Sequence, residues 1–295
     1  MLFRDSKERF AASGPLRPKF IDVHPQYDSD SGYTSTNETP ESFVALLDKH
    51  CPDQTFKRGG GIASGGEIAF FVLLPRCEEV VVIDHSYSSL HAFYLKALWL
   101  ADRGVKGFRQ ILNGELDWQQ TVDQTMLEVL KVIPAPKHPN TYLNQVSTRG
   151  LWATEWDLVS NETLEIALSR LDKLTLVHGD LTDLPQFGKL DLCYVSNAME
   201  HHSRLHRSPR LPAFESLMVE DGVLLYTGQD YRTEWEQDKT PPYGGRYVDR
   251  DYPNWGDVEG AIQGPRTSWN HQLRRYRPQP VTTESSTFTL AEVAS

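Results

Sequence analysis

The hydrophobic pattern of residues 56–100 predicts two strands and two helices, with a glycine-rich turn after the first strand. Residues 56–64 indicate that first strand, and residues 67–74 indicate a short apolar helix after the turn. Val80 to Ile83 form a continuous β-branched run, which is typical of a strand buried on both faces of a parallel sheet. This second strand ends at Asp84, and a second apolar helix is expected to follow it.

The turn and the strand-ending acid together predict a nucleoside site. A turn containing Gly65 and Gly66 lets a ligand approach the backbone, and an acid roughly 20 residues later can accept both hydroxyls of a ribose. The dinucleotide spacing G-x-G-x-x-G is absent, and Glu67 at the helix start repels phosphate but attracts an amine or a sulfonium. S-adenosylmethionine, which has no phosphate, therefore fits better. An ordinary βαβ unit with a tight turn is the alternative interpretation.

The pattern further along the chain predicts the rest of a parallel sheet. Strands alternating with helices imply right-handed crossovers. Core strands are expected at Leu174–Val177, Leu190–Val195 and Val223–Thr227, a helix at Leu211–Met218, and antiparallel edge strands at Gln272–Tyr276 and Ser286–Leu290.

A long insert separates the second and third of these strands. The helix after Asp84 is expected to end near Gly104, and the next strand begins only at Leu174. Such a length requires structure of its own. Amphipathic helices are predicted at 118–131, with an inward face of Val122, Met126, Leu127 and Leu130, and at 162–171. We expect the insert to lie over the carboxyl ends of the strands, where ligands bind in open α/β sheets.

Two irregular segments flank this core. Residues 1–40 are poor in apolar side chains and predict an arm outside the core, and the hydroxyl-rich run 31–37 is either a polar arm or a strap over a ligand. Asn37 or Thr39 then caps a helix whose inward face is Phe43, Leu46 and Leu47. The aromatic segment 231–269 is either a surface wrap or a substrate lid.

These elements predict an α/β fold with a doubly wound, mostly parallel, Rossmann-like sheet, a large helical insert and an aromatic lid. The corresponding division of the chain is an N-terminal arm and helix (1–54), the first half of the sheet (55–104), the helical insert (105–172), and the second half of the sheet (173–295) with the lid at about 231–270.

Composition restricts the partners. The formal net charge of −10 argues against nucleic acid or an anionic membrane surface, because both favour a basic face. No apolar run is long enough to span a bilayer, and residues 1–14 lack the apolar core of a signal peptide. Cys51, Cys77 and Cys193 show no metal or redox spacing, and are interpreted as buried thiols. A cytoplasmic protein with a small-molecule substrate is therefore expected.

The sequence resembles two known groups of proteins. Five strands, with Asp84 ending the second and Gly179-Asp180 ending the third, resemble the class I S-adenosylmethionine-dependent methyltransferase fold over residues 55 to 230. The segments Ile62–Glu67, Val82–Asp84 and Leu95-Lys96 are similar to the diacylglycerol 3-amino-3-carboxypropyl transferases of betaine-lipid synthesis. Those proteins also carry a large helical insert between the second and third strands.

The resemblance implies a set of site residues at the carboxyl ends of the strands. Those implied for the S-adenosylmethionine site are Ala63, Ser64, Gly65, Gly66 and Glu67 around the methionine portion, Asp84, His85 and Ser86 around the ribose, Asp180 and Leu181 along the adenine, and Ser196 and Asn197 facing the sulfonium and the reacting carbon. Asn197, Ser196, Tyr33 and Glu200 are the catalytic candidates. Asp180 equally fits a turn with Thr182 and Asp183, and Asn197 and Glu200 fit caps of a following helix. No metal is expected at His201, His202 and His206, because adjacent histidines on a helix point in different directions.

The loop departs from the methyltransferase pattern. Gly61 stands where most methyltransferases have an acid, and Ala63 and Glu67 replace the first and third glycines. Together with this departure, the resemblance to the 3-amino-3-carboxypropyl transferases implies displacement at the γ-carbon of the methionine tail. The expected reaction releases methylthioadenosine, either by 3-amino-3-carboxypropyl transfer or by cyclisation to azetidine-2-carboxylate. Methyl transfer to a small molecule and non-catalytic nucleoside binding are the alternatives.

Overall fold

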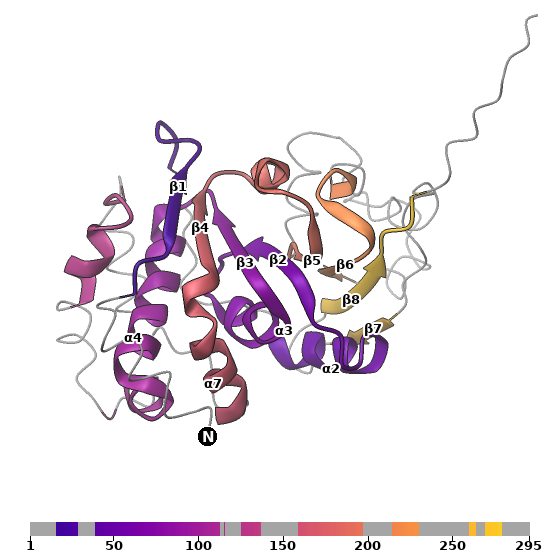
Figure 1. Cartoon of the computed structure of the whole chain (residues 1–295), viewed down its shortest axis with the longest axis horizontal. Helices are drawn as coiled ribbons and strands as arrows, with labels where there is room; N and C mark the ends of the chain where they lie inside the picture. Colours follow the sequence, from indigo (N-terminus) through magenta and orange to yellow (C-terminus); the bar gives the residue numbers. More distant parts are fainter. Residues whose placement is uncertain are drawn as a thin grey trace, which may run out of the picture.

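The computed structural model of this chain describes residues 16–28, 39–112, 115, 125–136, 159–196, 214–229, 260–263 and 269–278, and within them eight strands form one sheet (Figure 1). The strands are β1 (Lys19–Asp22), β2 (Phe56–Ile62), β3 (Cys77–Asp84), β4 (Leu174–His178), β5 (Leu190–Tyr194), β6 (Met218–Gln229), β7 (Gly260–Gln263) and β8 (Trp269–Arg275). The described helical elements include α2 (Pro40–His50), the π-helical η1 (Ala69–Leu73), α3 (Leu74–Arg76), α4 (Tyr87–Leu112), α7 (Asn161–Ser169), and the 3-10 turns η3 (Leu171–Lys173) and η4 (Leu181–Phe187).

The strand order confirms the predicted fold class. Across the sheet the order is β1-β4-β3-β2-β5-β6-β8-β7. All neighbouring pairs from β1 to β6 are parallel, whereas β8 is antiparallel to both β6 and β7. Leaving β1 aside, the seven remaining strands have the order and the single reversed strand of the class I methyltransferase-type sheet.

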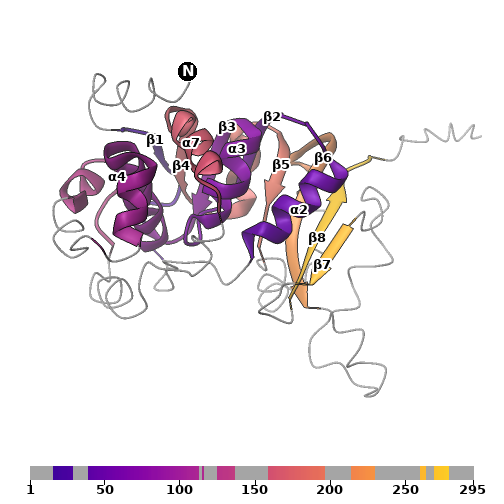
Figure 2. The same cartoon turned by 90° about the horizontal axis from the view of Figure 1, so that it is seen from below.

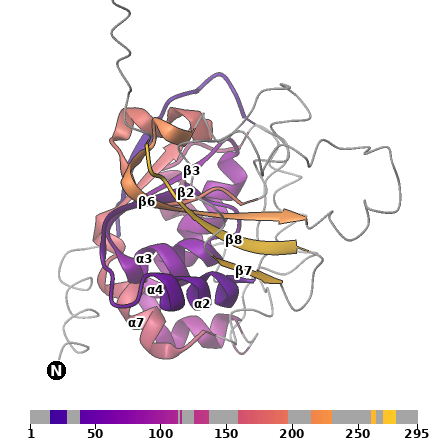
Figure 3. The ribbon, with the colours of Figure 1, turned by 90° about the vertical axis from the view of Figure 1, so that its right-hand side faces the viewer.

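Both faces of the sheet are buried, as the β-branched run in β3 predicted. Val80 and Val82 pack into the larger apolar cluster, which includes residues of α2, α4 and α7, while Val81 and Ile83 pack into a second cluster with residues of η4. α2, α3, α4 and α7 lie together on one side of the sheet (Figures 2 and 3). A strand with both faces covered therefore carries apolar residues continuously.

The glycines of β2 allow unusually close packing of its neighbours. A Cβ atom at Gly61 would lie 2.5 Å from the backbone oxygen of Tyr194, and one at Gly59 would lie 2.4 Å from Cys77 Sγ. Gly61 and Tyr194 are register partners in the parallel pair of β2 and β5. Any larger residue at position 61 would thus have to displace the backbone of β5.

The predicted helix before β2 is confirmed. α2 begins after Thr39, and Phe43, Leu46 and Leu47 are buried on its inward face. The side chain of Thr39 forms no capping hydrogen bond. Instead its backbone N–H donates to Nε2 of His271, at 3.1 Å, and so ties the start of α2 to β8.

The N-terminal region differs from the expectation of an arm outside the core. Lys19 to Asp22 form β1, which pairs in parallel with β4 at the edge of the sheet, and Leu16 is buried. The strand has four residues and none of them is fully buried, so it carries little apolar signal. Its stability comes from a partner more than 150 residues away in the sequence, which no local pattern reveals.

The described parts of the insert correct two expectations. α7 confirms the second predicted helix, but it packs against α3 and α4 on the helical side of the sheet rather than over the strand ends. In the helical stretch 125–130, Leu127 and Leu130 are exposed, while Val129 and the following Ile133 are buried. Met126 is partly buried and packs against the apolar core, as predicted. The predicted inward face was therefore wrong at Leu127 and Leu130, and Val122 lies outside the described residues.

Other element boundaries also shift. α4 spans Tyr87–Leu112, but φ and ψ of 65° and 179° at Gly104 are non-helical, so the first helical stretch ends at this glycine as expected and a second stretch follows it to Leu112. β6 begins at Met218, five residues earlier than predicted, at the residue where the preceding helix had been expected to end.

The C-terminal expectations are met in part. The predicted strand near Gln272 is confirmed as β8, and its antiparallel partner at the sheet edge is β7, within the segment expected to be irregular. Residues 230–259, which include most of the predicted lid, and Ser286–Leu290 lie outside the described residues, and the four-part division of the chain stays a prediction.

Within the described residues, no helix is both long enough and apolar enough to cross a bilayer.

Cys51, Cys77 and Cys193 are all buried and free of disulfides, as expected.

We expect Gly61→Ala to lower the free energy of unfolding by about 1–3 kcal/mol, because its Cβ meets backbone rather than a movable side chain. Gly60→Ala is the matched control, because the nearest atoms to its Cβ are the methyl ends of Leu190, and the nearest backbone atom, the Val81 oxygen, is 3.3 Å away rather than 2.5 Å. Urea unfolding measures both variants. Equal losses for the two would contradict the close approach of β2 and β5.

Candidate active site at the carboxyl edge of the sheet

The glycine turn after β2 forms the first part of the site. Ala63 N–H donates to the oxygen of Ile83 on β3, at 2.9 Å, and Gly66 N–H donates back to the Ala63 oxygen at 2.8 Å. Ser64 has φ 45° and Gly66 has φ 95°. At position 66 a Cβ would lie 2.7 Å from the ring of Phe93, so both the conformation and the space require glycine. The predicted turn at Ser64, Gly65 and Gly66 thus lies at the end of β2.

A buried ion pair between Lys96 and Glu67 contacts this turn. Nζ of Lys96, on α4, donates to the Gly65 oxygen at 2.6 Å and to Glu67 Oε1 at 3.0 Å. Both charged side chains have an exposed fraction of 0%. Burial lowers the pKa of Lys96, and the Glu67 carboxylate opposes that shift.

This pairing changes the role expected of Glu67. The sequence suggested that its carboxylate faces the ligand, but in this structure Glu67 is fully buried and bonded to Lys96. It therefore positions the turn that carries Ser64 and Gly65.

Asp84 joins the turn to the next loop. Its Oδ2 accepts from Ser64 N–H at 3.3 Å, and its Oδ1 accepts from Ser86 N–H at 3.0 Å. The side chain is 3% exposed. Burial raises the pKa of Asp84, and the nearby His85 ring and the two backbone donors oppose the rise. His85 itself is 45% exposed, with Nδ1 at 3.9 Å from Asp84 Oδ1.

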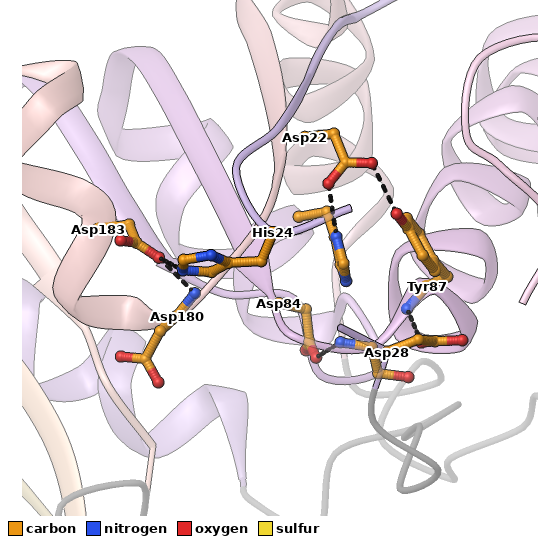
Figure 4. Close-up of polar contacts among 9 residues, drawn as sticks. Asp22, His24, Asp28, Asp84, Tyr87, Asp180 and Asp183 are labelled. Carbon is orange, nitrogen blue, oxygen red and sulfur yellow. Dashed lines mark hydrogen bonds and ion pairs between the residues drawn. The ribbon is translucent and has the colours of Figure 1, made fainter. Parts of the chain in front are cut away.

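The loop after β4 is shaped by Asp183. Oδ2 of Asp183 accepts from Asp180 N–H at 2.8 Å and lies 2.9 Å from His24 Nε2, in the loop after β1 (Figure 4). The turn considered as the alternative role for this loop is thus present, formed by the Asp183 side chain. Asp180 is partly exposed and Leu181 is buried. The carboxylate of Asp180 points away from His24 (Figure 4).

Ser196 lies after β5, beside the central strand β2. It has φ 54°, a left-handed conformation that is uncommon outside glycine. Its backbone oxygen accepts a hydrogen bond from Thr227 N–H at 3.1 Å. Ser64 and Ser196 are thus two non-glycine residues with positive φ at the ends of neighbouring strands. Such strained positions cluster at functional sites. The other catalytic candidates, Tyr33, Asn197 and Glu200, lie outside the described residues.

Sequence reasoning missed one group of polar residues. Asp22 at the end of β1 contacts both His178 and Tyr87, with distances of 2.8 Å from its Oδ1 to His178 Nδ1 and 2.6 Å from its Oδ2 to the Tyr87 hydroxyl. Asp28 also accepts from Tyr87 N–H at 3.1 Å (Figure 4). The one available signal was His178 itself, a polar residue that ends a buried strand directly before Gly179-Asp180.

The structure therefore brings most of the described candidates to one edge. Ser64, Asp84 and Ser86 are joined by hydrogen bonds, and Asp180 and Ser196 follow the strands on either side of this centre. Among the described residues, no group of His, Cys, Asp and Glu side chains is arranged to hold a metal ion. The three histidines considered for a metal lie outside those residues.

No protein-family model and no curated protein matches the sequence. Solved structures similar to this one include N-methyltransferase NodS from Bradyrhizobium japonicum (11% identity, 81% of this chain and 96% of that chain, TM-score 0.35). They also include rRNA methyltransferase aviRa from Streptomyces viridochromogenes (13%, 84% and 88%, 0.43) and a ribosomal protein L11 methylase from Lactobacillus delbrueckii subsp. bulgaricus (10%, 88% and 86%, 0.41). At these scores the fold assignment rests on the strand order rather than on the matches.

We expect Lys96→Met to lower the free energy of unfolding by about 3–5 kcal/mol, because it leaves the buried Glu67 carboxylate without a partner. Adding Glu67→Leu should recover most of that loss, since the second change removes the uncompensated charge. Lys131→Met is the control, because the Lys131–Glu128 pair is solvent-exposed and contributes at most about 1 kcal/mol. A Lys96→Met loss as small as the control would contradict the role of the pair.

Proposed function

We propose that this protein binds S-adenosylmethionine at the carboxyl edge of the sheet and transfers a group from its sulfonium. The observation that carries the proposal is Asp84, a buried carboxylate that ends the second core strand and faces the glycine turn across a hydrogen bond to Ser64. An acid in this place can accept the two hydroxyls of a ribose. The glycine turn followed by Asp84 predicted the same nucleoside site from the sequence.

The arrangement gives each part of the cofactor a neighbour. The methionine portion would lie along Ser64, Gly65 and Gly66, and the ribose would lie at Asp84, with His85 and Ser86 beside it. Asp180 and Leu181 would border the adenine. Ser196, together with Asn197, would border the sulfonium, on the strand next to the turn. These roles are proposals that the positions at the strand ends support.

The reaction requires little of the protein beyond positioning the reactants. A sulfonium carries its own leaving group, so no covalent nucleophile on the protein is required. The attacking atom forms one bond to carbon, the carbon–sulfur bond breaks, and its electron pair stays on sulfur as a neutral thioether. Holding the reactants in line and excluding water supply the acceleration.

For the reacting carbon, we propose the γ-carbon of the methionine tail, and so 3-amino-3-carboxypropyl transfer or cyclisation. The similarity of Ile62–Glu67 to the aminocarboxypropyl-transferring group supports this choice. Two observations add support. Both concern acids near the methionine tail, since Gly61 stands where most methyltransferases have an acid. The Tyr194 backbone leaves no room there for a side chain, and the nearby Glu67 is occupied by Lys96. The tail amine would therefore be held in another way.

Methyl transfer is the second candidate, because the sheet has the methyltransferase strand order and the same site would serve it. The two reactions differ in the leaving group. Attack on the methyl releases S-adenosylhomocysteine, whereas attack on the γ-carbon releases methylthioadenosine.

We expect Asp84→Asn to weaken S-adenosylmethionine binding by roughly 10- to 100-fold, because charge-assisted hydrogen bonds to the ribose are lost. Titration calorimetry of the folded variant measures this. Asp102→Asn is the control, because Asp102 is a solvent-exposed residue of α4 paired with Arg103. Unchanged affinity in a folded Asp84→Asn variant would rule out this ribose site.

Incubation of the protein with S-adenosylmethionine alone, followed by mass spectrometry, separates the reactions. We expect methylthioadenosine together with azetidine-2-carboxylate, formed when the α-amine attacks the γ-carbon and then loses a proton. If neither product forms alone, small amine and thiol acceptors should be added. Accumulation of S-adenosylhomocysteine would identify methyl transfer instead, and binding without any product would indicate a non-catalytic nucleoside-binding protein.

A further inference from the structure

Three polar side chains end three adjacent strands at the same level of the sheet. Asp22 on β1 is the register partner of His178 on β4, and His178 is the register partner of Asp84 on β3. The residues two positions earlier, Phe20, Leu176 and Val82, all pack into the cluster on the helical side. Because side chains alternate along strands, the three polar groups lie on that same side, next to the start of α4.

Asp22 and Tyr87 fix the ring of His178. A carboxylate only accepts hydrogen bonds, so His178 Nδ1 donates to Asp22 across 2.8 Å. The Tyr87 hydroxyl donates to the other Asp22 oxygen, and the Tyr87 ring stacks on the imidazole with 3.8 Å between centroids. With the proton held on Nδ1, a neutral ring has its lone pair on Nε2.

That second nitrogen has an unused capacity for a hydrogen bond. His178 is fully buried, and Nε2 has no partner among the described residues. Buried polar atoms are seldom left this way, and each such atom requires an explanation. β4 lies between β1 and β3, so a ring whose Nδ1 turns toward Asp22 turns Nε2 to the side of Asp84. His178 is also close enough to Asp84 to affect the pKa of that carboxyl.

We propose that Nε2 of His178 is a second acceptor for the ribose diol, beside Asp84. This inference rests on the nucleoside site proposed above and assigns it a residue that selects for the sugar. A diol presents two O–H donors, and each oxygen of Asp84 already accepts one backbone N–H. One hydroxyl binds the carboxylate and the other binds the imidazole. A 2′- or 3′-deoxy sugar leaves Nε2 buried and unpaired, and so binds less tightly.

Asp22 acts through His178 as a positioning residue. An asparagine in its place can present its amide N–H₂ to Nδ1, and that nitrogen then becomes the acceptor. The ring proton moves to Nε2, which turns from acceptor to donor and no longer accepts the hydroxyl. The added strand β1 would thereby contribute to ligand selection without touching the ligand.

A cycle of ligand and protein changes tests the proposal. Adenosine, 2′-deoxyadenosine and 3′-deoxyadenosine are titrated by calorimetry into the wild-type protein and His178→Phe, which keeps an aromatic ring against Tyr87. In the wild type we expect adenosine to bind roughly 5- to 10-fold more tightly than one of the deoxy analogues. In His178→Phe that ratio should fall to about one- to twofold, while the ratio for the other analogue stays unchanged. Equal ratios in both proteins would overturn the proposal.

Asp22→Asn provides the second variant, because it retains both aromatic rings. It should lose the same ligand discrimination, and the imidazole ¹⁵N shifts of His178 should show the proton moving from Nδ1 to Nε2. A tautomer change with full discrimination retained would contradict the acceptor role. If the wild type binds none of the three nucleosides, the nucleoside site itself fails. Binding with ratios unaffected by either variant would contradict only the role of His178.

Discussion

The carboxylate of Asp84 is the contact on which the carboxyl edge of the sheet depends. It accepts one N–H from the turn after β2 and one from the loop that begins α4, and so fixes two loops on neighbouring strands. Both donors are backbone N–H groups, so these two bonds do not depend on the side chains of Ser64 and Ser86. The same two bonds fix the positions of both oxygens of a nearly buried acid at this edge of the sheet.

A buried ion pair on the helical side of the sheet constrains the glycine turn in the same region. Lys96 and Glu67 bond to each other and to the Gly65 oxygen beneath the turn. Buried pairs of this kind contribute little net stability, since desolvation of the two ions offsets most of their attraction. Their effect here is conformational, because a lysine that bonds both the turn and its following residue permits one arrangement of the loop.

Local patterns in the sequence predicted the centre of the fold but not its edges. The β-branched run of β3 and the turn before Glu67 are decided by neighbouring residues, so both were predicted correctly. β1 was missed because its four residues become a strand only through pairing with β4. The bonding of Asp22 to His178 joins residues 156 positions apart. Glu67 was recognised as unusual, but its partner, Lys96, was named only as part of a motif, and the pairing depends on how α4 crosses the sheet.

The energetics of Asp84 connect folding to ligand binding. Burial raises the pKa of this acid, so the folded chain holds its proton more readily than the unfolded chain. Between the two pKa values folding takes up a proton, and the stability from this group falls as the pH rises through that window. Hydroxyl donors from a ribose favour the ionised form and lower the pKa again. If a ribose binds at Asp84 as proposed, binding in the same window would release the proton and remove part of the cost of burying the carboxylate. Burial of the ionised acid is unfavourable for the empty fold, and the proposed ribose contacts would make it favourable in the complex, which fits a binding role for Asp84.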